Sequence, residues 1–96
     1  MTTENEELRA TNETIDFGME VEAFIQSRLG RYLIGRAEED IAAAVETLKR
    51  TDPENAKTIR ELQNAIYRAE SIGYWLADAV QAGFNAEREF TERGTD

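Results

Sequence analysis

Apolar and small residues recur every three or four positions along two long stretches of the chain, a spacing that predicts two amphipathic helices. The intervals alternate between four and three residues, as in the a and d positions of a heptad repeat. The first stripe consists of Gly30, Ile34, Ala37, Ile41, Ala44 and Leu48, and the second of Ile59, Leu62, Ile66, Ala69, Gly73, Leu76 and Val80. We expect one helix over residues 28–50 and another over residues 53–90.

The residues between the two stripes are typical of a tight connection. Asp52 is a good N-cap, and Pro53 suits the first position of a helix. So short a connection makes the two helices antiparallel neighbours. Facing positions then have numbers that add to 103, which places Gly30 opposite Gly73. We therefore expect an antiparallel helical hairpin in an all-α protein, and Gly73→Leu should force its helices apart.

A shorter helical repeat, from Phe17 to Ile25, precedes the hairpin. It lies roughly opposite the stripe of the next helix, so one straight helix cannot bury both. The chain should therefore break near Ser27, which is also a plausible N-cap for the next helix, and a short helix over 17–26 should cover the far end of the last helix. The residues expected to meet there are Phe24 and Ile25 with Trp75, Val80 and Phe84.

Polarity and charge divide the chain further. Residues 1–14 are polar enough to predict a flexible acidic arm, and residues 91–96 a flexible tail, which leaves one helical domain over 15–90. The net charge of the chain is −9, and residues 1–22 carry seven of its twenty acidic side chains. Because the remaining charge is nearly balanced, a broad nucleic-acid-binding surface is not expected.

The residue types argue against enzymatic chemistry. The chain has no histidine and no cysteine, which excludes a histidine base, a thiolate nucleophile and the usual zinc ligands. The acidic side chains at 38–40 are consecutive and point in different directions from a helix. We expect no enzyme, no catalytic or metal site and no cofactor. No apolar run approaches the roughly 20 residues that span a bilayer, so no membrane association is expected either.

The later half of the last helix carries apolar side chains that the hairpin does not use. Either the short helix covers them, or they meet a second copy and form a helical-bundle dimer; both hold if the cover is partial. Two tyrosines of this helix, Tyr67 and Tyr74, could anchor a protein partner or lie at the edge of the packing. The proposed partner or oligomer interface consists of Ile72, Trp75, Ala79, Phe84, Phe90, Tyr67 and Tyr74.

The segment "SRLGRYLIGR" gathers basic residues in an acidic chain. Its glycines lack the preceding strand and the spacing of a phosphate-binding loop. The basic residues fall on the back of the helix over 28–50, where acidic residues of the short helix, Glu20 and Glu22, would partly neutralise them or a partner would dock. Gly35 has no assigned role. The candidate docking patch is Arg28, Arg31, Tyr32 and Arg36.

The chain resembles small acidic helical proteins encoded by tailed bacteriophages and prophages. The resemblance covers about residues 17–83 and comprises an FG…V.AF..S.LG.YL..RA element, an Asp-Pro turn, an I..LQN…AE segment and a tryptophan-to-glycine ending. The residues that carry it are Phe17, Gly18, Phe24, Ser27, Gly30, Tyr32, Leu33, Arg36, Ala37, Asp52, Pro53, Leu62, Gln63, Asn64, Glu70, Trp75 and Gly83. The resemblance implies a phage origin and supplies no activity.

Together these features indicate a non-enzymatic interaction or assembly protein of a phage, acting in the host cytoplasm or incorporated in the virion. Its partner would be a phage or host protein, a second copy, or both, and among homo-oligomers a dimer is favoured. The alternative is a phage-encoded inhibitor that binds a host protein, such as one that itself binds nucleic acid.

Overall fold

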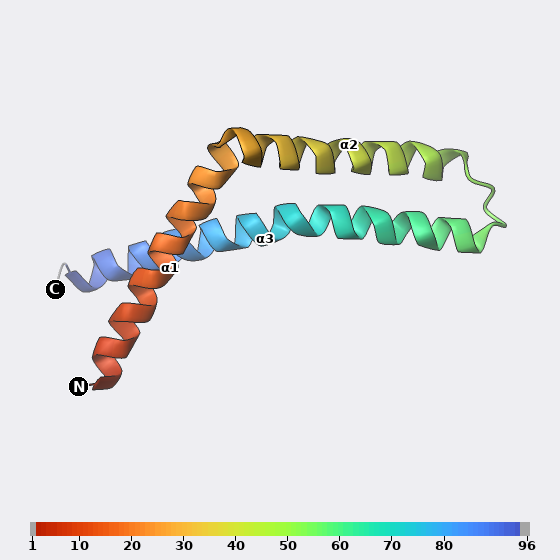
Figure 1. Ribbon diagram of the computed structural model, residues 1–96. Helices are drawn as coiled ribbons and strands as arrows, with labels where there is room; N and C mark the ends of the chain where they lie inside the picture. The colour runs from red at the N-terminus through yellow and green to blue at the C-terminus, as the bar shows by residue number, and fades with distance from the viewer. Residues whose placement is uncertain (1, 95–96) are drawn as a thin grey trace. The chain divides into compact units, whose positions relative to one another are not determined.

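The computed structural model describes residues 2–94, and these residues form three α-helices and no strand. The helices are α1 (Thr2–Gln26), α2 (Arg28–Arg50) and α3 (Ala56–Gly94); the first half of α3 packs against α2 and its second half against α1 (Figure 1). The predicted all-α class is confirmed. Met1 and residues 95–96, part of the predicted tail, lie outside the described residues.

The helices divide into two compact units, each described here by itself. Unit 1 contains α1, Ser27 and α3 from Leu76 onward, whereas unit 2 contains α2, the connection and α3 up to Trp75. The last helix therefore contributes to both units. The joint between α1 and α2 is Ser27, whose backbone N–H and hydroxyl both donate to the carbonyl of Phe24.

Helix α1 is much longer than predicted: it begins at Thr2, so the expected beginning at residue 17 is wrong. The heptad spacing continues upstream through Leu8 and Thr11, which are half-buried and lie beside Phe90 of α3. The hydroxyls of Thr11 and Thr14 donate to carbonyls four residues back, at 2.9 and 2.8 Å, which satisfies them inside the helix. Because threonine counts as a polar residue, the apolar pattern of the sequence does not reveal this part of the stripe.

Unit 1 is centred on a close approach between two glycines. A Cβ built on Gly18 would lie 3.0 Å from the Cα of Gly83, and one built on Gly83 would lie 3.1 Å from the Cα of Gly18. Both glycines are buried, and so is Val21, the one buried hydrophobic side chain of the described residues. Helix α1 thus crosses α3 where neither has a side chain, and the two backbones touch.

In unit 2, α2 has its predicted bounds, whereas α3 begins at Ala56 instead of residue 53. The Asp52 carboxylate accepts a hydrogen bond from the N–H of Glu54 at 2.9 Å, so it stabilises the turn. Asn55 caps the helix instead: its side-chain oxygen accepts from the N–H of Thr58 at 3.2 Å, and its carbonyl from Ile59 at 3.1 Å. Because Asn55 is a second good capping residue, three positions after Asp52, α3 begins later than predicted. At its other end, α3 continues to Gly94, past the predicted end at residue 90.

The stripe of α2 and the stripe of α3 face each other, and no third helix of unit 2 covers them. Their residues are half-buried, except Gly30, which is buried, and Gly73, which is exposed. A Cβ built on Gly73 meets no heavy atom within 4 Å, so the expected crowding at this residue is wrong. The close approach of two glycines lies at Gly18 and Gly83 instead, where α1 crosses α3.

A candidate protein-interaction groove between α2 and α3

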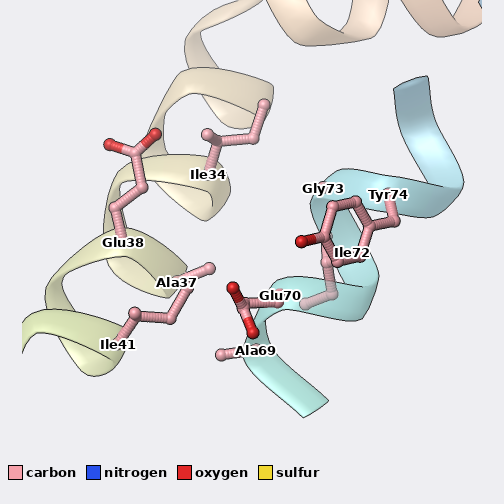
Figure 2. A pocket seen from close by; sticks show the side chains of 9 residues that line it. All are labelled: Ile34, Ala37, Glu38, Ile41, Ala69, Glu70, Ile72, Gly73 and Tyr74. Carbon is pink, nitrogen blue, oxygen red and sulfur yellow. The ribbon is translucent and has the colours of Figure 1, made fainter. Parts of the chain in front are cut away.

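Unit 2 contains an open groove of about 320 Å³ between its two helices (Figure 2). Its floor is apolar because successive stripe residues of both helices point toward it. The space is present because Gly73 contributes no side chain and nothing else fills the position of its Cβ. The lining residues are Ile34, Ala37, Glu38 and Ile41 of α2 with Ala69, Glu70, Ile72, Gly73 and Tyr74 of α3.

Two carboxylates, Glu38 on α2 and Glu70 on α3, line this apolar groove. The Glu70 side chain is half-buried and lies in the space between the two helices in Figure 2, whereas Glu38 is exposed. Neither takes part in the ion pairs of unit 2, which join Arg36 to Asp40, and Lys49 and Arg50 to Glu46. The groove therefore offers an apolar surface beside unneutralised negative charge.

Four of the predicted α3 interface residues lie in unit 2, and all are exposed. The exposed fractions are 71% for Tyr67, 42% for Ile72, 61% for Tyr74 and 69% for Trp75. Ile72 and Tyr74 line the groove, whereas Tyr67 and Trp75 do not. The structure therefore gathers only part of this predicted set at one site.

The other three predicted interface residues lie in unit 1, against or near α1. Ala79 is half-buried, and its carbonyl oxygen lies 3.1 Å from the position of a Cβ on Gly18. Ala79 thus lies against α1 of its own chain. Phe84 and Phe90 remain about half exposed, and each lines a small crevice together with α1 residues.

The predicted basic patch lies on the outer side of α2. Arg31, Tyr32, Arg36 and the acidic Glu39 surround Gly35 in an open depression of about 310 Å³. No heavy atom lies within 4 Å of a Cβ built on Gly35, so the missing side chain leaves this surface hollow. Asp40 forms an ion pair with Arg36 at 3.4 Å, and this neighbour, followed by Tyr32, raises the pKa of the Arg36 guanidinium.

Reasoning from the sequence missed the groove itself. Its α2 side consists of Ile34, Ala37 and Ile41, which the sequence places in the stripe between the two helices of the hairpin. Two leucines of α2 outside the groove, Leu29 and Leu33, are exposed at 59% and 42%. The available signal was Gly73, because a glycine inside an otherwise apolar stripe leaves a gap wherever its neighbour does not approach.

Charge is distributed unequally between the units. Residues 28–75 contain eight acidic and eight basic side chains, so unit 2 has no net charge. The remaining twelve of the twenty acidic and three of the eleven basic residues belong to unit 1, which carries the whole net charge of −9.

Within residues 2–94, no group of three or more acidic, histidine or cysteine side chains could hold a metal ion. None of the helices in this part of the chain is long and apolar enough to cross a membrane. Comparisons with family models, with curated proteins and with solved structures give no match to this chain.

Proposed function

We propose that this chain is a non-enzymatic protein-interaction and assembly protein of the phage type, and that it binds through the groove of unit 2. The observation that carries the proposal is the open apolar groove, whose floor is formed by residues of two facing helical stripes. In a larger helical protein a third helix would cover such stripes. The open groove between α2 and α3 is therefore suited to a helix from another chain.

The shape and chemistry of the groove favour a protein segment over a small molecule. The groove is open to solvent, rather than enclosed on all sides as ligand pockets usually are. A large exposed aromatic residue, Tyr74, belongs to its lining. Such residues are enriched at protein interfaces because they remove much apolar area from water at low entropic cost.

We further propose a homo-oligomer, with a dimer as the simplest form. The hairpin of unit 2 would keep the antiparallel pairing in which Ile41 faces Leu62 and Ala44 faces Ile59. Contacts between copies through unit 2 meet no net repulsion, because that unit is neutral, whereas contacts through unit 1 would bring together two surfaces of charge −9.

The phage origin rests on the resemblance of residues 17–83, and the site of action would be the host cytoplasm or the virion. A second candidate function, an inhibitor of a host protein, is favoured by the charge of unit 1. A surface with twelve acidic and three basic residues suits a basic host surface, such as one that binds nucleic acid.

Affinity capture with groove variants tests the proposal. The tagged wild-type chain, Gly73→Leu and Ala42→Leu would be used to retain proteins from a lysate that contains the untagged chain. Both substitutions add a leucine side chain at an exposed helical position of unit 2, but only Gly73 lines the groove. We expect a protein, either the untagged copy or another one, to be retained by the wild-type chain and Ala42→Leu and lost with Gly73→Leu.

The same experiment separates the two candidate functions. Retention that survives Gly73→Leu but falls with added salt would indicate the acidic surface of unit 1 and the inhibitor function. Equal retention by all three proteins without salt dependence, or no retention at all, would contradict binding through the groove.

A further inference from the structure

Two carboxylates lie on opposite walls of the groove of unit 2, Glu38 on α2 and Glu70 on α3, and the other seven lining residues carry no charge. Among the described residues of unit 2, neither carboxylate belongs to an ion pair. The positions three and four residues before and after each of them hold no charged side chain, so no neighbour on the same helix face neutralises them. The groove therefore combines an apolar floor with uncompensated negative charge on both sides.

An occupant of the groove would change the surroundings of these carboxylates. Glu70 is already half-buried, and its side chain lies in the space between the two helices (Figure 2). A molecule that covers the apolar floor removes water from around Glu70 and, in part, from around Glu38. A carboxylate that loses its water without gaining a cation or hydrogen-bond donors destabilises the complex. The occupant must therefore bring positive charge together with apolar side chains.

The length of the groove suits about two turns of an α-helix. Its α2 wall extends from Ile34 to Ile41, which corresponds to about 10 Å along the helix axis. A helix that lies in an apolar groove of this length makes contact through apolar residues at positions i, i+3 or i+4, and i+7. The positions on either side of that apolar stripe then lie next to the two walls, one of which carries Glu38 and the other Glu70.

We propose that the groove binds an amphipathic helix of a different protein, with lysine or arginine on both sides of its apolar stripe. Helix α1 of a second copy does not have this chemistry, because it contains seven acidic residues and one basic residue. The inference rests on the proposed function, since it states the chemistry of the partner of that same groove. Two copies of the chain would then associate through another part of unit 2.

The test uses two synthetic peptides as probes, each about 20 residues long so that it forms a helix by itself. Both have leucine at the a and d positions of the heptad. The basic probe has arginine at e and g and the acidic probe has glutamate there, so that like charges oppose pairing of each probe with itself. Fluorescence anisotropy of the labelled probes, titrated with the full-length chain at about 0.15 M salt, measures binding. We expect the basic probe to bind at least about tenfold more tightly than the acidic probe.

Glutamine variants locate the charges that the basic probe meets. Glu38→Gln/Glu70→Gln removes both carboxylates of the groove with little change of shape and should weaken binding by at least about tenfold. Glu39→Gln/Glu61→Gln is the matched control, because it removes one exposed carboxylate from each of the same helices outside the groove. The control should weaken binding by no more than about twofold, since salt screens exposed charges. Equal weakening by both pairs would indicate general attraction to an acidic chain and would overturn the inference.

Reversal of the charges provides a gain of binding as a second measurement. Glu38→Lys/Glu70→Lys should exchange the preference, so that the acidic probe binds more tightly than the basic one. Gly73→Leu fills the groove and should weaken binding of the basic probe by at least about tenfold. Circular dichroism of each variant shows that its fold is kept. An unchanged preference after charge reversal, unchanged binding by Gly73→Leu, or no binding of the basic probe to the wild-type chain would overturn the inference.

Two further outcomes would identify a different occupant. A wild-type dimer of the 10.9 kDa chain in sedimentation equilibrium that Gly73→Leu dissociates would place a second copy in the groove and overturn the inference. If the basic probe does not bind, but the wild-type chain retains another protein in a manner that Gly73→Leu abolishes, the groove is an interaction site and only the chemistry of its occupant is wrong. Failure of the proposed function is distinct, because nothing would then be retained through the groove.

Discussion

Two glycines of α3, Gly73 and Gly83, have opposite roles although they lie ten residues apart in one helix. Gly83 is buried, and a Cβ there would lie 3.1 Å from the Cα of Gly18 and 3.4 Å from the carbonyl oxygen of Thr14. These are backbone atoms, which cannot move aside as the end of a flexible side chain can. Gly73 has no neighbour within 4 Å of the same position. At residue scale, Gly83 is therefore required for packing, and Gly73 leaves space.

Alanine at these two positions should change stability in opposite directions. Gly83→Ala should lower the free energy of unfolding by about 1–3 kcal/mol, because the added methyl group forces α1 away from α3. Gly73→Ala should raise it by up to about 1 kcal/mol, since alanine is the better helix former and meets no obstacle. Urea unfolding followed by circular dichroism measures both. Stabilisation by Gly83→Ala would contradict the close crossing of the two helices.

At the scale of elements, the bounds of the helices follow from capping as much as from the apolar stripes. The connection between α2 and α3 holds two capping residues in succession: Asp52 closes the turn and Asn55 caps the helix. Lys49 and Arg50 end α2, and their ion pairs with Glu46 lie on the surface, where such pairs add little stability. The start of α3, in contrast, depends on the side-chain amide of Asn55, whose oxygen accepts a hydrogen bond from the N–H of Thr58.

Asn55→Ala should lower the free energy of unfolding by about 1 kcal/mol, because the N–H of Thr58 loses its side-chain acceptor. Asn64→Ala is the matched control: this asparagine is exposed inside α3, where alanine should be neutral or slightly stabilising. Thermal unfolding of the two variants beside the wild type measures the difference. An equal effect of both changes would show that Asn55 is not the cap.

At the scale of the whole molecule, charge and packing follow the same division. Unit 1 carries the entire net charge of −9 and holds the backbone contact between Gly18 and Gly83, whereas unit 2 is neutral and contains the groove. Repulsion among like charges opposes the folding of unit 1 and is screened by salt, since the Debye length falls from about 30 Å at 0.01 M to about 3 Å at 1 M. Unit 2 has no such net repulsion.

Raising the salt concentration should therefore stabilise unit 1 more than unit 2. Amide hydrogen exchange, measured by mass spectrometry at about 0.01 M and about 0.5 M sodium chloride, should slow in α1 and in α3 beyond Leu76. Exchange in α2 and in α3 before Leu76 should change less. An equal response of all segments would show that charge does not distinguish the two units.

Much of the fold could be predicted from spacing alone. The heptad intervals predicted the all-α class, the break at Ser27 and the bounds of α2, because a helix repeats its faces whatever lies around it. The beginning of α1 could not be found in this way. Its first half buries Leu8 and Thr11 beside Phe90, a residue nearly eighty positions away, and no local pattern distinguishes such a threonine from one in a polar tail.

The candidate site was predicted in its chemistry and missed in its location. Composition by itself determined that the chain lacks histidine and cysteine, and the pattern determined that it has apolar helix faces and a basic segment on α2. Only the tertiary structure decided which faces remain open. Both Gly73 and Gly83 lie inside helical stripes, yet one borders a groove and the other touches a backbone. The reason is physical: heptad spacing specifies which side of a helix is apolar, whereas the approach of a second helix depends on contacts between residues distant in the chain.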